Sequence, residues 1–171
     1  MSGKIITMID LEEKNHCICQ KYSNTQEECI NEYTIREQGK SVKLQPKNST
    51  ESVIAIIIDK CIVTDNNTKC DALFLYENNN NKYSVLVELK GAAEIPKAFF
   101  QLDYTRKNRA EYKKIIEKFQ VHKQNQKYAI VSNGMLSKPE LEKLENQYKI
   151  RVKKILHCEA TTPIPDLKEI L

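Results

Sequence analysis

Residues 70–91 read CDALFLYENNNNKYSVLVELKG, two apolar runs on either side of an asparagine tract. Short runs rich in leucine, valine and aromatic residues, bounded by turn-forming residues, predict β-strands. Asparagine favours tight turns because it tolerates left-handed backbone conformations. The stretch therefore predicts a β-hairpin with strands over 70–76 and 83–90 and a turn at Asn78 to Asn81.

The register of this hairpin follows from a turn centred between Asn79 and Asn80. In that register Asp71 lies directly opposite Glu88 on the neighbouring strand. Lys90 shares their face, because side chains alternate between the two faces of a strand. The hairpin therefore predicts two carboxylates and one ammonium group at one end of one face.

This arrangement needs a physical explanation, because like charges opposite each other destabilise a strand pair by up to about 1 kcal/mol. Burial of the carboxylates adds a desolvation cost. A divalent cation removes both difficulties, and Mg²⁺ prefers carboxylate oxygens while keeping waters for a substrate. Lys90 could then hold an attacking water or neutralise charge on a phosphate. The alternative is that Asp71, Glu88 and Lys90 are ordinary solvated charges at a strand end.

The flanking patterns predict one α/β domain over residues 1–171 with a mixed central sheet and helices on both faces. The N-terminal part, about 9–38, reads as short helices, 39–51 as a loop, and the core as about 50–157. Within the core we expect a strand over 53–63, with a helix capped at Thr50 as the alternative, and then a helix from Glu94 to about Gln120. A strand over 127–132 follows, and then a helix that the Ser137–Glu140 capping box opens and that ends near Tyr148. The last expected element is a strand over 149–157.

The order Cys70-Asp71, a sixteen-residue gap, then Glu88-Leu89-Lys90-Gly91 resembles the motif of the PD-(D/E)XK, or restriction-endonuclease-like, nuclease superfamily. Cys70 stands where the family usually has proline. The resemblance implies a restriction-endonuclease-like core and Mg²⁺-dependent hydrolysis of phosphodiester bonds. It also implies that Asp71, Glu88 and the main-chain carbonyl of Leu89 bind the metal, while Lys90 activates or orients water.

The resemblance extends to two further positions. Many members have a helical glutamate ahead of the first strand, for which Glu28 and Glu32 are candidates; we take Glu32 as the expected ligand. Others have a glutamine on the helix after the lysine, where Gln101 lies. Thr105 stands where one variant of the family has a tyrosine.

Positive charge is concentrated in the second half of the chain. Residues 1–88 carry 10 basic and 13 acidic side chains, and residues 89–171 carry 17 basic and 10 acidic ones. Such asymmetry favours a polyanionic partner. Lys97, Arg106 and Arg109, on the helix after the motif, are candidates for phosphate contacts, and a solvated helix face is the alternative.

The six cysteines are expected to be reduced thiols, because Met1 to Ile6 leads straight into acidic residues without the apolar stretch of a secretory signal. Cys17, Cys19 and Cys29 beside His16 could begin a zinc site, although their spacing fits no common zinc pattern. The longest apolar run, Val53 to Ile58, is too short to cross a membrane. These features predict a cytoplasmic protein with no membrane partner.

Together the patterns predict a nuclease that hydrolyses DNA with Mg²⁺, for which Mn²⁺ would substitute. RNA is a less favoured substrate. Because one domain of this size offers little surface for sequence readout, a homodimer or a larger complex is also expected. The alternative function is a catalytically silent nuclease-like domain that binds nucleic acid or a protein partner.

Overall fold

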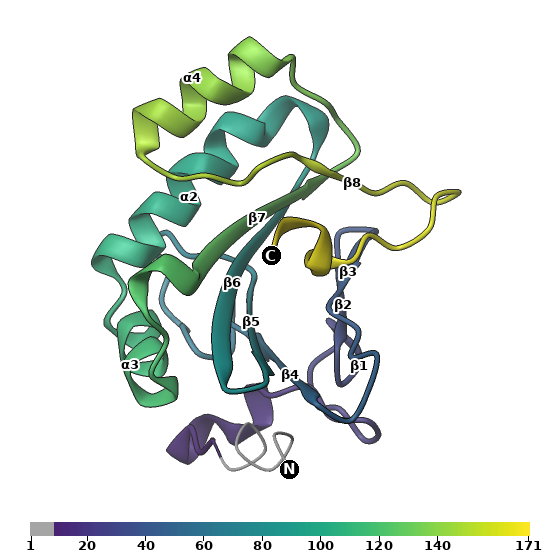
Figure 1. The fold of residues 1–171 in the computed structure, drawn as a ribbon, viewed down its shortest axis with the longest axis vertical. Helices are drawn as coiled ribbons and strands as arrows, with labels where there is room; N and C mark the ends of the chain where they lie inside the picture. Colours follow the sequence, from purple (N-terminus) through teal and green to yellow (C-terminus); the bar gives the residue numbers. More distant parts are fainter. Residues whose placement is uncertain (1–8) are drawn as a thin grey trace.

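The computed structural model describes residues 9–171, which form two sheets, three α-helices and four short 3₁₀ helices (Figure 1). Met1 to Ile6, on which the expectation of no secretory signal depends, lies outside the described residues. The strands are β1 (Cys29–Asn31), β2 (Thr34–Glu37), β3 (Lys40–Lys43), β4 (Glu51–Ile57), β5 (Ala72–Asn78), β6 (Asn81–Lys90), β7 (Gln126–Ser132) and β8 (Leu156–His157). The helices are η1 (Glu12–Cys17), η2 (Ala92–Glu94), α2 (Ile95–Asn108), α3 (Ala110–Phe119), η3 (Lys123–Asn125), α4 (Lys138–Tyr148) and η4 (Leu167–Ile170).

The hairpin of β5 and β6 has the register that the asparagine turn predicts. Tyr76 pairs with Tyr83 and Ala72 with Val87. Asn79 and Asn80 have φ angles of 50° and 71°. Positive φ at both central residues is what a two-residue hairpin turn of type I′ requires, and asparagine accepts it at low cost. The turn chemistry therefore sets the register of the whole hairpin.

The larger sheet is mixed and has the strand order β4-β5-β6-β7-β8. The first three strands are antiparallel neighbours, whereas β7 runs parallel to β6 and β8 parallel to β7. The predicted strand over 53–63 is β4, shortened to Glu51–Ile57, and the predicted strand over 149–157 is reduced to Leu156 and His157. An α/β fold with a mixed central sheet is thereby confirmed.

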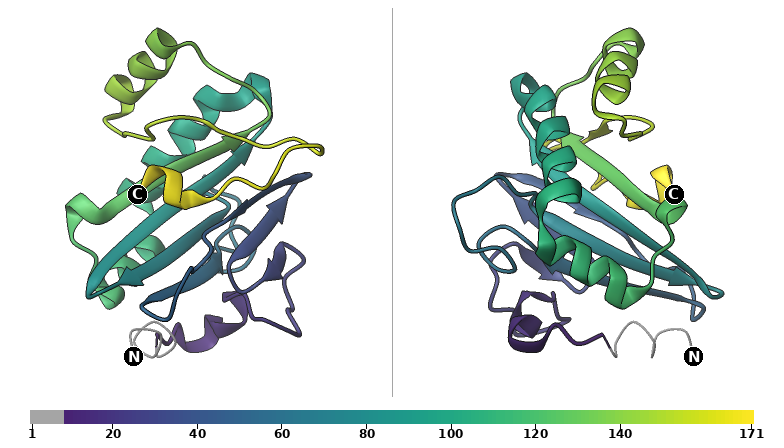
Figure 2. Two further views of the ribbon diagram at one scale, coloured as in Figure 1. Left: turned by 45° about the vertical axis from the view of Figure 1, so that its right-hand side comes forward. Right: turned by 90° about the vertical axis from the view of Figure 1, so that its left-hand side faces the viewer.

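One face of this sheet is covered by α2 and α3, and α4 packs beside α2 (Figure 2). The single helix expected from Glu94 to Gln120 is wrong, because Arg109 is extended (φ −96°, ψ 108°) and separates α2 from α3. The Arg109 guanidinium turns away to bind Asp65. The capping box at Ser137 and Glu140 opens α4 as expected.

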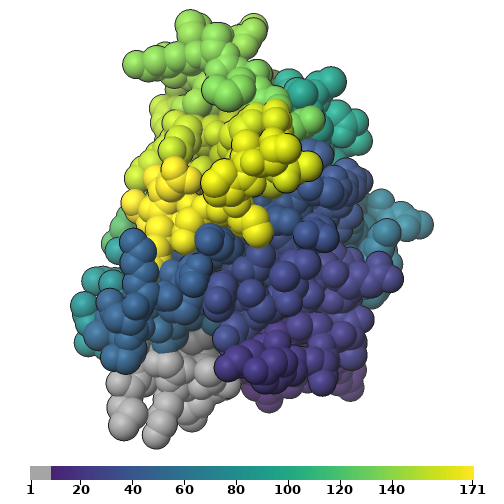
Figure 3. Space-filling model, turned by 90° about the vertical axis from the view of Figure 1, so that its right-hand side faces the viewer, coloured from purple at the N-terminus to yellow at the C-terminus, as the bar shows by residue number. Residues whose placement is uncertain are grey.

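The opposite face carries a second, three-stranded sheet and the C-terminal segment instead of the expected α-helices. Figure 3 shows the N-terminal strands and the yellow C-terminal segment side by side on one face of the molecule. The two are joined where the Lys43 amide donates to the Pro165 carbonyl at 3.1 Å. The helical prediction for 9–38 and the loop prediction for 39–51 are therefore wrong over β1, β2 and β3. Gly39 supplies the positive φ of 76° for the β2–β3 turn.

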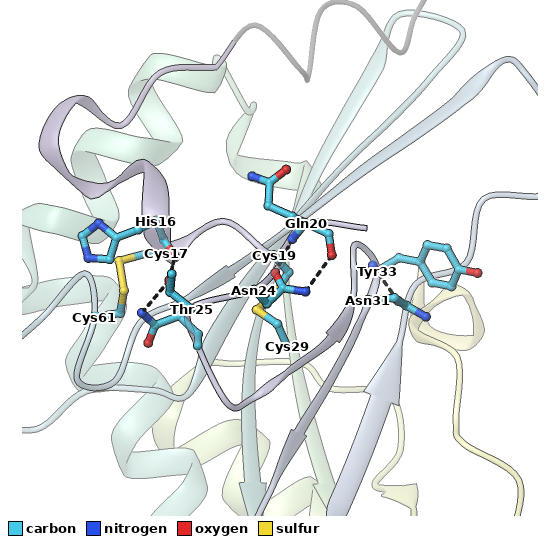
Figure 4. Close-up of a disulfide and its surroundings, with 11 residues drawn as sticks. His16, Cys17, Cys19, Gln20, Asn24, Thr25, Cys29, Asn31, Tyr33 and Cys61 are labelled. Carbon is cyan, nitrogen blue, oxygen red and sulfur yellow. Dashed lines mark hydrogen bonds between the residues drawn. A yellow bond between two sulfur atoms is a disulfide. The ribbon is translucent and has the colours of Figure 1, made fainter. Parts of the chain in front are cut away.

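Two disulfides involve the N-terminal segment (Figure 4): one joins it to the chain after β4, and the other lies within it. Cys17 is bonded to Cys61 and Cys19 to Cys29. The expectation of six reduced thiols is wrong for these four cysteines, whereas Cys70 and Cys158 are free and buried. Disulfides are typical of oxidising compartments, so the cytoplasmic location stays a prediction. Among residues 9–171, none of the helices has the length and apolar character needed to cross a membrane.

Candidate metal centre

The acid pair lies where β5 begins and β6 ends. Glu88 is in β6, and Asp71 directly precedes β5, one residue beyond the last strand pair, Ala72 with Val87. The Asp71 carbonyl accepts hydrogen bonds from Ile58 and Asp59 at the end of β4. The main chain of Asp71 is therefore positioned by β4, β5 and β6, at the end of the sheet where β5 begins and β6 ends.

A reciprocal set of hydrogen bonds links the two acids. The Asp71 amide donates to Glu88 Oε1 at 3.1 Å, and the Leu89 amide donates to Asp71 Oδ2 at 2.8 Å. Lys90 Nζ lies 3.4 Å from Glu88 Oε2, with Glu88 only 1% exposed and Lys90 14% exposed. The structure thus brings together Asp71, Glu88, Lys90 and the Leu89 main chain.

The electrostatics of the pair differ from those of solvated charges. Burial raises the pKa of Glu88 well above its usual value, and the neighbouring Asp71 carboxylate raises it further, while Lys90 opposes both effects. Burial also raises the pKa of Asp71, against the opposing hydrogen bonds from Glu88 and the Leu89 amide. The pair therefore favours binding a positive partner, either a proton or a metal ion.

We expect the Glu88→Gln variant to be more stable than the parent protein in EDTA at pH 7. Because the pKa of Glu88 is raised in the folded state, the folded protein keeps a proton that the unfolded chain releases above about pH 4.5. The stability of the parent protein therefore falls as the pH rises above about 4.5. Thermal unfolding should show a gain of at least about 3 °C at pH 7, or about 1 kcal/mol for a chain of this size, shrinking towards pH 4. The exposed Glu142→Gln variant should show no such gain. A lower melting temperature for Glu88→Gln at pH 7 would contradict the expectation.

Glu32, the expected N-terminal ligand, does not join the pair. It is exposed in the turn between β1 and β2, since this segment forms a hairpin and not a helix. Two other acids interact with Asp71 through their charges, Glu37 at the other end of that hairpin and Asp59 after β4. Burial raises the pKa of Glu37, and the charges of Asp71, Glu28 and Asp59 raise it further. A Gln38-Gly39 turn signal could have revealed the hairpin of β2 and β3, and with it Glu37, in the sequence.

Gln101 lies next to the chain that leads into the acid pair. Its Nε2 donates to the Lys69 carbonyl at 3.0 Å. Its Oε1 is buried and has no hydrogen-bond partner among the described residues. Lys69 also approaches Asp59, at 3.7 Å. The predicted glutamine is therefore near the site, with one polar atom unused.

The three basic candidates have different surroundings. Arg109 is buried and binds both Asp65 oxygens, at 2.7 and 2.9 Å, and the Thr68 carbonyl. Its guanidinium therefore holds the loop before Asp71 and offers little to a phosphate. Arg106 binds Asp103 and is half-buried, whereas Lys97 is exposed in the first turn of α2.

The cysteine and histidine cluster does not form the zinc site considered from the sequence. Within residues 9–171, the group of three ligand-capable side chains close enough to share an ion is His16, Cys17 and Cys61. Figure 4 shows that two of these sulfurs are already bonded to each other and that Cys19 pairs with Cys29. A disulfide sulfur carries no thiolate charge for a metal.

Comparison with known proteins identified no relative. No family model matches the chain, and neither the curated proteins nor the solved structures gave a match. The function is therefore argued from the acid pair itself.

Proposed function

We propose that this protein is a Mg²⁺-dependent nuclease of the PD-(D/E)XK type that hydrolyses phosphodiester bonds in DNA. The observation that carries the proposal is the pair of half-buried Asp71 and buried Glu88, with Lys90 3.4 Å from a Glu88 oxygen. The order of three antiparallel strands, a helix and a parallel strand supports the resemblance to the restriction-endonuclease-like core.

The side chains fit a small divalent cation. Asp71 and Glu88 offer only oxygen ligands, which Mg²⁺ and Mn²⁺ prefer, and the raised pKa of Glu88 reflects a charge that a cation would stabilise. The Leu89 amide donates to Asp71 Oδ2 at 2.8 Å, and its carbonyl is the third ligand that the resemblance implies. A bound Mg²⁺ would polarise the phosphate and lower the pKa of a coordinated water.

The chain's own residues complete the chemistry. Asp71 and Glu88 would orient the ion against one phosphate. Lys90, held by Glu88, would orient the attacking water and neutralise negative charge that develops on phosphorus oxygens. Gln101, which donates to the carbonyl of Lys69 two residues before Asp71, would position the scissile strand or the metal's waters. Lys97, exposed at the start of α2, is a candidate phosphate contact.

Metal titration of the intact protein tests the proposal. We expect Mn²⁺ to bind the parent protein in calorimetry and the Asp71→Asn variant to bind it at least about tenfold more weakly, since the variant loses one charged ligand. The Glu142→Gln variant is the control, because Glu142 is exposed in α4 and is not part of the acid pair. Cleavage of plasmid and single-stranded DNA should require Mg²⁺ or Mn²⁺ and stop in EDTA.

The second candidate is a silent nuclease-like domain that binds without hydrolysis. Among the described residues, the three-ligand group is the cysteine and histidine cluster, so the structure places no third acid tightly against Asp71 and Glu88. Metal uptake without cleavage of any DNA or RNA substrate would favour this second candidate, and no metal uptake would contradict both the ion site and the nuclease.

A further inference from the structure

A basic hollow lies at the start of β7, away from the acid pair. It has a volume of about 290 Å³ and lies between β7, the segment that follows α4, and Ile170. Its cationic lining comprises Arg106, Lys123, Lys127, Lys149, Arg151 and Lys153, and no acidic residue lines it. Among the described residues, these side chains concentrate positive charge on a concave surface, and such a surface favours the binding of a polyanion.

Three of these cations have no acidic partner within the described part of the chain. Lys123, Lys127 and Lys149 form no salt bridge there. By contrast, Arg106 binds Asp103 at 2.8 Å, and Arg151 lies 3.9 Å from Glu145. The unpaired lysines leave positive charge available to a ligand.

A second hollow adjoins the first, and the two together are called the groove. This second hollow of about 420 Å³, between α3 and the start of β7, shares Arg106 and Gln126 with the first; Lys113 and the acid Glu117 also line it. Among residues 9–171 no strand pairs with this part of the β7 edge, because β8 pairs only with Val131 and Ser132. Figure 2 shows the segment that follows α4 running past this uncovered part of the strand. An elongated occupant fits such a groove better than a single small anion.

We infer that this groove binds the phosphodiester backbone of a nucleic-acid strand. Lysine ammonium groups contact phosphates without reading bases, so the groove would hold a strand independently of its sequence. Arg106 stacks over the Tyr128 ring, with 5.9 Å between its guanidinium carbon and the ring centroid. The aromatic ring adds a surface beside which a base could lie.

The groove is distinct from the acid pair and does not depend on hydrolysis. Gln126 pairs with Ser84, whereas Glu88, four residues further along β6, pairs with Ile130. At about 3.3 Å per residue the separation along the strand is about 13 Å, close to the rise of four base pairs. A strand bound in the groove could therefore extend towards the acid pair.

Binding measured in EDTA, where no metal is present, tests the groove separately from the nuclease. The probes are fluorescent 20-nucleotide single-stranded DNA, duplex DNA and single-stranded RNA, followed by anisotropy. The test variant is Lys123→Glu/Lys127→Glu/Lys149→Glu. The control, Lys47→Glu/Lys138→Glu/Lys143→Glu, has the same net charge but changes exposed lysines outside the groove.

We expect the test variant to raise Kd at least tenfold for one or more probes, and the control to change it no more than about threefold. The slope of log Kd against log salt should fall by about 2, since three phosphate contacts are lost at about 0.7 each for a single strand. Should the test variant fail to fold by circular dichroism, Lys127→Gln/Lys149→Gln replaces it, with an expected rise of at least threefold.

Three results would overturn the inference. The first is an equal weakening of probe binding by the test and control variants, and the second is no measurable binding of any probe. The third is displacement of the probes by polyglutamate as efficiently as by unlabelled DNA, which would assign the groove to acidic peptides. Groove-dependent binding without Mg²⁺-dependent cleavage would uphold this inference and overturn the nuclease.

Discussion

The Lys90→Ala variant should cleave DNA about 10²- to 10³-fold more slowly than the parent protein with Mg²⁺. The loss follows from removing the ammonium group beside Glu88, which would stabilise the charge that develops on the phosphate; removal of one such group typically costs a factor of this size. Asp71→Ala should lose at least as much, because it removes a metal ligand. Initial rates on plasmid and on single-stranded DNA, at saturating Mg²⁺, measure both effects.

Lys82→Ala is the matched control for this experiment. Lys82 lies in the same strand as Lys90 but at the opposite end, where its ammonium lies 5.1 Å from the centroid of the Phe119 ring. Its variant should keep the parent rate. Cleavage that survives both Lys90→Ala and Asp71→Ala would refute the assigned site, and a contaminating nuclease would then be the source of activity.

Removal of the Cys17–Cys61 disulfide should cost about 4 kcal/mol of unfolding free energy. The bond joins residues 44 positions apart, and the cost of closing a loop of that length in the unfolded chain sets the figure. Urea denaturation of the Cys17→Ala/Cys61→Ala variant against the parent protein, both without reductant, measures the difference.

The second disulfide provides the comparison. Cys19 and Cys29 are 10 positions apart, so Cys19→Ala/Cys29→Ala should cost less, about 2.7 kcal/mol in the same model. Dithiothreitol should destabilise the parent protein strongly and each double variant less. If the parent protein unfolds at the same urea concentration with and without dithiothreitol, the disulfides do not form in solution.

The central hairpin could be predicted from the sequence because its determinants are local. The asparagine turn, the alternation of side chains and the pairing of Asp71 with Glu88 all lie within one short stretch. The capping box at Ser137 was predictable for the same reason, since it depends on a residue only three positions away.

The rest of the site depends on contacts between distant segments. The charge of Asp71 acts on Glu37 although the two residues are far apart in the chain, and residues 9–38 have a weak local pattern. Arg109 was assigned to phosphate because helical periodicity continues through it. The helix breaks at Arg109, whose guanidinium binds Asp65, 44 residues earlier. The cysteine pairing could not be read from spacing, since Cys61 is far from its partner in the chain.

The Cys17–Cys61 bond also has a consequence for the integrity of the molecule. Any cut of the backbone between these two cysteines would leave both fragments covalently attached, and they would separate on a gel only after reduction. The N-terminal fragment would remain at high effective concentration beside the larger sheet. A clipped molecule could therefore keep β1, β2 and β3 in place, and with them the charge of Glu37 that interacts with Asp71.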